Sequence, residues 1–130
     1  MPMAPFPPIR LELPPCPASA RDARHFVGSA LAPVAPDEVT ELAVLLTSEL
    51  VTNAVLYAGG PIEVEVRPGR TTVRVAVADH DERVPVPRRP DADAISGRGL
   101  GMVEALAENW GIDLRDGVGK AVWFELPTAR

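Results

Sequence analysis

The sequence predicts one α/β domain, a two-layer sandwich in which a mixed, mainly antiparallel sheet is covered on one face by three helices. Three observations support this prediction. Several short stretches alternate apolar and polar residues as strands do, three longer stretches repeat apolar residues at helical spacing, and the two kinds follow one another along 130 residues. A chain of this length can close a single core, so we expect one domain over residues 1–130.

The first half of the chain predicts a strand and two helices. The proline-rich residues 1–7 are expected to be a flexible N-terminus, and "PIRLEL" after them alternates as a half-buried strand. The run 18–31 contains no proline and repeats apolar residues at helical spacing. The longest helix starts after Pro36 with two acidic residues and ends at the glycines 59–60. Its predicted apolar stripe is Val39, Leu42, Leu46, Leu50, Ala54 and Tyr57.

The second half predicts two hairpins separated by a loop and a helix. "IEVEV" and "TTVRVAVAD" alternate strongly around the turn "RPGR". Residues 80–98 have many charges, three prolines and no periodicity, which is typical of a lid loop. The stretch "LGMVEALAENW", residues 100–110, is helical in pattern, and "GIDLRDGVGKAVWFELP" closes the chain as a hairpin around Asp116 and Gly117.

Composition excludes several classes of protein. The net charge of −5 argues against sequence-independent nucleic-acid binding, which needs a concentrated basic surface. Cys16 is the only cysteine, so an internal disulfide and a thiolate metal cluster are excluded, and a structural thiol in a reducing compartment is expected. No signal peptide and no membrane span of about 20 apolar residues is identified, so the predicted location is cytoplasmic. His25 is predicted to be a surface histidine or one whose hydrogen bonds are satisfied, rather than a metal ligand, because no other ligand-type residue lies near it at metal spacing.

Three polar features stand out against this background. Glu49 and Asn53 lie one helical turn apart among apolar residues, Asp79 ends a strand, and "SGRGLGM" precedes or opens the third helix. Alternating glycines at a helix start leave backbone N–H groups open to an anion, although a flexible joint explains them equally well. A lone amide such as Asn53 suffices for Mg²⁺ when phosphates supply the other ligands, and Glu49 could accept a proton. The alternatives are a solvated Glu49, an Asn53 that caps a loop, and an Asp79 that begins a turn.

Four stretches together resemble a known family. "ELVTNAVLYA", "VAVAD", "SGRGLGM" and "GKAVWFELP" resemble the N box, the adenine-contacting aspartate strand, the glycine-rich G2 box and the last strand of the Bergerat-fold (GHKL) ATPases. The short chain and its stretch "SGRGLGMVEALAENWG" are similar to bacterial histidine-kinase-like ATP-binding domains related to anti-sigma-factor serine/threonine protein kinases. The resemblance extends from about Arg10 to Pro127.

The resemblance implies ATP and Mg²⁺ as cofactors and a role for each matching residue. Asn53 would coordinate Mg²⁺, Glu49 would be the general base, and Asp79 would accept a hydrogen bond from the adenine amino group. The residues implied to hold the phosphates beneath the lid are Gly97, Arg98, Gly99, Leu100 and Gly101. Three positions depart from the family pattern: no glycine follows Asp79 in "DHDERVP", Tyr57 replaces a frequent histidine, and Lys120 replaces a frequent threonine near the adenine.

Two functions follow from the resemblance. The first is a serine/threonine protein kinase that phosphorylates an anti-anti-sigma (STAS) partner and sequesters a sigma factor. The second is a nucleotide-binding module that controls a protein partner through its lid without phosphoryl transfer. Relatives of this type often pair, so a homodimer is an open alternative to a monomer.

Overall fold

The computed structural model describes residues 7–57, 60–80, 94–115 and 119–128, with the backbone alone for 94–99 and 115. The order of its elements is the predicted one: a strand, two helices, two strands, a helix and two strands. These are β1 (Ile9–Leu13), α1 (Ala18–Leu31), α2 (Asp37–Tyr57), β2 (Ile62–Pro68), β3 (Thr72–Asp79), α3 (Ala94–Leu106), β4 (Asn109–Arg115) and β5 (Gly119–Pro127).

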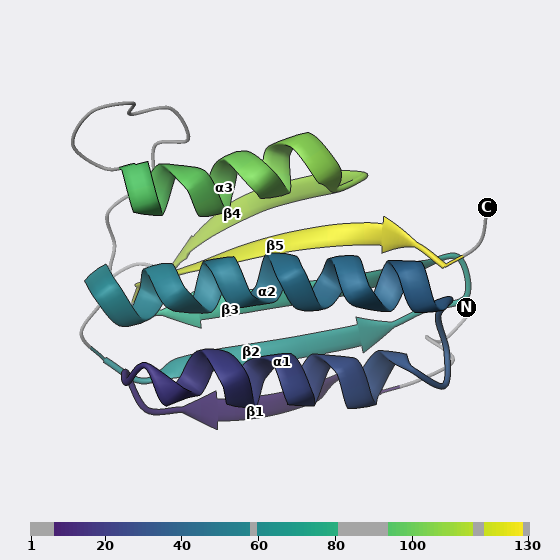
Figure 1. Cartoon of the computed structure of the whole chain (residues 1–130), viewed down its shortest axis with the longest axis horizontal. Helices are drawn as coiled ribbons and strands as arrows, with labels where there is room; N and C mark the ends of the chain where they lie inside the picture. Colours follow the sequence, from purple (N-terminus) through teal and green to yellow (C-terminus); the bar gives the residue numbers. More distant parts are fainter. Residues whose placement is uncertain (1–6, 58–59, 81–93, 116–118, 129–130) are drawn as a thin grey trace.

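The five strands form one sheet in the order β1-β2-β3-β5-β4, and every neighbouring pair is antiparallel. The predicted two-layer α/β sandwich is confirmed, but the expectation of a mixed sheet is wrong. The reason is the even number of helical passes between β1 and β2: α1 runs back along the sheet and α2 runs forward again, so β2 starts where β1 ended (Figure 1). A single crossover helix would have produced a parallel pair.

The three helices cover one face of the sheet (Figure 1). The central helix α2 packs on β2, β3 and β5, with α1 over β1 and β2 on one side and α3 over β4 on the other. Alternate residues of the inner strands point into this layer. The strand residues that are completely buried in the core are Ile62, Val64, Val66, Val73, Val75 and Phe124.

The buried face of α2 differs from the predicted stripe. Its buried residues are Ala43, Leu46, Thr47, Leu50, Val51 and Ala54, whereas Tyr57 is 40 % exposed. The helix contacts α1, α3 and the sheet, so its buried face is wider than one stripe and is rotated toward α1. Among the described residues, α2 is also the one helix long and apolar enough to span a membrane. Here its buried residues belong to the hydrophobic core.

The boundaries of α3 were predicted wrongly at both ends. The helix runs from Ala94 to Leu106, and Trp110 lies in β4 opposite Phe124 of β5. Glycines weaken a helix by about 1 kcal/mol each relative to alanine, which is why local propensity favours a later start. Burial of Leu100 and Val103 against the core outweighs that preference. Of the predicted lid 80–98, residues 94–98 are therefore helical, and 81–93 lie outside the described residues.

Candidate functional site

The predicted site residues come from four elements that meet at one end of the molecule. The C-terminal ends of α2 and β3, the start of β5 and the start of α3 all lie at the left in Figure 1. These segments are separated by up to dozens of positions in the sequence, and the antiparallel topology brings them together. The structure therefore gathers most of the residues that the sequence singled out.

Glu49 and Asn53 are half-buried on the same flank of α2. The opposite flank contacts α1: Arg24 donates to Ser48 Oγ at 3.0 Å, and Val44 packs near Gly28. Glu49 follows Val44 by five positions, and Asn53 follows Ser48 by five, so each points about 140° away from a residue that contacts α1. Glu49 and Asn53 therefore face away from α1, on the side of α2 where α3 packs. The Oδ1 atom of Asn53 is shielded from solvent.

Asp79 forms a buried ion pair that the sequence analysis missed. The two residues Asp79 and Lys120 face each other across β3 and β5, and Lys120 Nζ donates to Oδ1 and Oδ2, each at 3.1 Å. Their side chains are 7 % and 11 % exposed. They alternate in step with the core residues Val77 and Val122, so the pair lies on the helix-covered face of the sheet. The register of the two strands was the missing information, since the residues are 41 positions apart.

The start of β5 approaches the end of β3 very closely. Gly119 has φ +154, and a Cβ atom there would lie 1.9 Å from the carbonyl oxygen of Asp79. His80, the next residue, packs its ring against Gly60, and its Nδ1 atom lies 3.0 Å from the carbonyl oxygen of Pro61. These contacts hold the backbone at the carbonyl of Asp79 and at His80, and the two hydrogen bonds from Lys120 orient the Asp79 carboxylate.

The predicted phosphate-binding glycines lie within the first turns of α3, rather than in a loop before it. Gly97, Arg98 and Gly99 are helical in backbone, Leu100 is 2 % exposed, and Gly101 is half-buried. The side chain of Leu100 packs in the core, so any contact of this residue with a ligand is made by its backbone. The helix starts at the same end of the molecule as the end of β3 and the C-terminal half of α2 (Figure 1).

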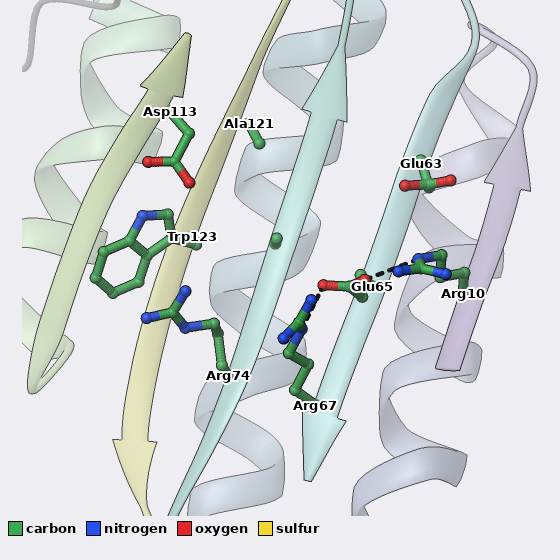
Figure 2. Close-up of a pocket in the computed structure, with 9 residues that line it drawn as sticks. Arg10, Glu63, Glu65, Arg67, Arg74, Asp113, Ala121 and Trp123 are labelled. Carbon is green, nitrogen blue, oxygen red and sulfur yellow. Dashed lines mark hydrogen bonds and ion pairs between the residues drawn. The ribbon is translucent and has the colours of Figure 1, made fainter. Parts of the chain in front are cut away.

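A second polar region lies on the opposite, helix-free face of the sheet. Figure 2 shows this hollow with the helices behind the strands. It has a volume of about 430 Å³, and its lining residues are Arg10, Glu63, Glu65, Arg67, Arg74, Ala76, Asp113, Ala121 and Trp123. It faces away from Asp79 and from α2, so it is separate from the site predicted from the sequence.

Arg10, Glu65 and Arg67 form an ion-pair network in this hollow. Glu65 accepts from Arg10 at 2.7 Å and from Arg67 at 2.8 Å. Burial by itself raises the pKa of Glu65, but the hydrogen bonds and charges of Arg67 and Arg10 outweigh burial and hold this pKa below its ordinary value. The sequence signal for this network was the alternation of Arg and Glu on the polar faces of β1 and β2.

On this helix-free, open face of the sheet, an arginine stacks on a tryptophan. The Arg74 guanidinium lies 4.0 Å from the centre of the Trp123 ring and donates to Glu125 at 3.0 Å. Gly111 makes room for the indole, since a Cβ there would lie 2.6 Å from the ring. The cation–π contact joins β3 to β5, and packing of the indole against Gly111 joins β5 to β4. Each arginine that lines the hollow is paired with a carboxylate: Arg10 and Arg67 with Glu65, and Arg74 with Glu125.

The described residues contain no cluster of three or more His, Cys, Asp or Glu side chains able to hold a metal ion. His25 is exposed on α1, as predicted, and Cys16 is half-buried with its Sγ 3.6 Å from Ser19 Oγ. The donor set near α3 is one carboxamide with a carboxylate one turn earlier. This set fits a Mg²⁺ ion that keeps several waters and is held mainly by a bound phosphate.

Comparison with known protein families identifies the family to which the chain belongs. Residues 13–126 match the family described as the histidine kinase-like ATPase domain. The chain belongs to this family. The resemblance predicted from the sequence is thereby confirmed, and the end of the molecule where Asp79, Asn53 and α3 meet is the natural candidate for the nucleotide site of this histidine kinase-like ATPase domain.

One solved structure shows the same fold. The histidine kinase-like ATPase domain is similar to the crystal structure of the RsbU and RsbW domains of Rv1364c from Mycobacterium tuberculosis, with a TM-score of 0.69 and 25 % identity. The match covers 97 % of this chain and 34 % of that chain, so this chain spans about a third of the length of the solved protein. A search of curated proteins finds no match.

Proposed function

We propose that the protein is a cytoplasmic, ATP- and Mg²⁺-binding regulator of the anti-sigma-factor type, which phosphorylates serine or threonine in a STAS partner and binds a sigma factor. The observation that carries this proposal is the placement of Glu49 and Asn53 on the flank of α2 that faces α3, in a chain of the histidine kinase-like ATPase family. Similarity to a structure that contains an RsbW domain supports the fold on which this proposal is built.

The roles proposed for the residues follow from their positions. The start of α3 holds the phosphates, because its first N–H groups, those of residues 94–97, have no partner within the helix and carry partial positive charge. The N–H groups of Gly99 and Gly101 lie inside the helical hydrogen-bond ladder, so phosphate binding through them requires this segment to unwind. Arg98 adds a positive charge to the same segment. Asn53 holds Mg²⁺ through Oδ1, which requires its shielded carboxamide to turn toward the phosphates. When bound, Mg²⁺ neutralises phosphate charge.

Phosphoryl transfer requires a base beside the terminal phosphate. Glu49 lies one turn before Asn53 on the same flank, so it takes the proton of the attacking serine or threonine hydroxyl as the new P–O bond forms and ADP leaves. Asp79 accepts a hydrogen bond from the base of the nucleotide at the opposite side of the site.

The proposal is tested first by calorimetric titration of ATP and ADP with and without Mg²⁺. Wild-type protein is expected to bind ATP more tightly with Mg²⁺, and Asn53→Ala to lose the magnesium-dependent part of the affinity. The matched control is Asn109→Ala, which removes a carboxamide from the open face of the sheet, where it donates to Glu125 at 3.3 Å. Absence of ATP binding to the wild type would refute the proposal.

Phosphoryl transfer is tested separately with labelled ATP and cognate STAS proteins. Glu49→Gln is expected to bind ATP normally and to lose transfer by about 10²–10⁴-fold, the usual contribution of a general base. The second candidate function is a non-catalytic module, which the departure from the family pattern after Asp79 favours. It predicts no transfer to any STAS partner, together with partner affinity that changes when ATP is added.

A further inference from the structure

The Asp79–Lys120 ion pair places a hydrogen-bond donor beside the carboxylate that is proposed to contact the nucleotide's purine base. The ammonium bonds both carboxylate oxygens at 3.1 Å, and both side chains are almost completely buried. Burying two charges is costly even when they are paired, so such a pair is weak evidence for a purely stabilising role. Its location between the sheet and the helix layer, at the end where α3 starts, favours a role toward a ligand (Figure 1).

The geometry of the strands makes this pair a fixed feature. Asp79 and Lys120 are register partners on adjacent strands, and Gly119 brings the start of β5 against the carbonyl of Asp79. Lys120 therefore places a hydrogen-bond donor directly beside the acceptor oxygens. An ammonium has three protons and a carboxylate several lone pairs, so each group can contact more than one neighbour at a time.

A donor beside an acceptor changes which bases fit. Adenine presents an amino donor next to a ring-nitrogen acceptor, and guanine or hypoxanthine presents a carbonyl acceptor next to a ring N–H donor. A carboxylate alone pairs with the adenine amino group and repels the carbonyl oxygen of a 6-oxopurine. A carboxylate with an adjacent ammonium can pair with either kind of purine. In a 6-oxopurine, the carbonyl oxygen accepts from Lys120 and the ring N–H donates to Asp79.

We propose that Lys120 is a specificity-determining residue of the nucleotide site, which lets the site bind 6-oxopurine nucleotides as well as adenine nucleotides. The inference rests on the proposed function, since it concerns the base of the nucleotide bound in the same site. Selectivity is a difference between two affinities, and removal of the Lys120 ammonium leaves the carbonyl oxygen of a 6-oxopurine against the Asp79 carboxylate.

The experiment compares ATP, GTP and inosine triphosphate by calorimetric titration in the presence of Mg²⁺. For the wild type, the dissociation constants of GTP and inosine triphosphate are expected to lie within about tenfold of that of ATP. Lys120→Met, which keeps an unbranched side chain of similar size and removes the donor, is expected to raise the preference for ATP by tenfold or more. Arg67→Gln is the matched control: it removes one cation from the open face and leaves the ratio unchanged.

Each outcome decides the inference. If the wild type binds ATP but binds both 6-oxopurine nucleotides more than tenfold more weakly, the inference is wrong and the proposed function stands. If a folded Lys120→Met keeps the wild-type ratio, Lys120 does not set selectivity. If no nucleotide binds the wild type, both the inference and the proposed function fail. Circular dichroism checks folding of the variant, and the wild-type comparison decides the inference even when the variant does not fold.

Discussion

Replacement of Gly119 by alanine tests the close approach of β5 to β3 on which the whole candidate site depends. Gly119 has φ +154, a conformation that residues with a side chain rarely adopt. An added Cβ would lie 1.9 Å from the carbonyl oxygen of Asp79 and 2.6 Å from the Cα of His80. Both atoms belong to the backbone, so no side-chain rotation relieves the overlap, and the end of β3 or the start of β5 must move.

The expected loss of stability follows from two terms. A backbone conformation that is unfavourable for alanine costs about 1–3 kcal/mol, and displacement of packed backbone costs about 1–3 kcal/mol more. The sum of about 2–6 kcal/mol is a large part of the roughly 5–15 kcal/mol that stabilises a typical domain. At about 3–4 °C per kcal/mol for a chain of this size, the midpoint of thermal unfolding should fall by about 6–24 °C.

A matched glycine provides the control. Gly28 lies within α1, and a Cβ there would make only ordinary contact, 3.6 Å from Val44 Cγ2. Gly28→Ala should therefore raise the free energy of unfolding by about 0.5–1 kcal/mol through helix propensity. Urea and thermal unfolding followed by circular dichroism measure both variants. A loss below about 1 kcal/mol for Gly119→Ala would show that the two strands do not approach in this way.

Two further substitutions test the open face and the core. Glu65→Gln should lower the free energy of unfolding by about 0.2–1 kcal/mol near neutral pH. Because folding lowers the pKa of Glu65, the carboxylate stabilises the protein above its unfolded-state pKa, and this stabilisation is lost as pH falls through its folded-state pKa. Urea unfolding at a series of pH values should therefore show that the stabilities of wild type and variant converge in acid. A gap that persists in acid would contradict this. Thr47→Val should raise the free energy of unfolding by about 1 kcal/mol, because Thr47 Oγ1 is buried with no hydrogen-bond partner in the described part of the chain. Equal or lower stability of the variant would indicate that this hydroxyl has a partner.

The sequence by itself determined the order of the elements, both hairpins and the family. Alternation of apolar and polar residues in 62–79 and 111–127 is a local signal, because the paired strands of each hairpin are close in the sequence. The half-buried pair Glu49 and Asn53 was also found locally, since residues one helical turn apart share a face in any helix.

Tertiary structure decided what depends on distant partners. Trp110 continues a helical pattern, but pairing of β4 with β5 places it opposite Phe124 in the sheet. The glycines of α3 are poor helix formers, and burial of Leu100 overrides them. Tyr57 fits an apolar stripe, yet the buried face of α2 is set by its three neighbours. The contact between Asp79 and Lys120 depends on strand register across 41 residues, a quantity that no local pattern contains because it is fixed by packing of the whole sheet.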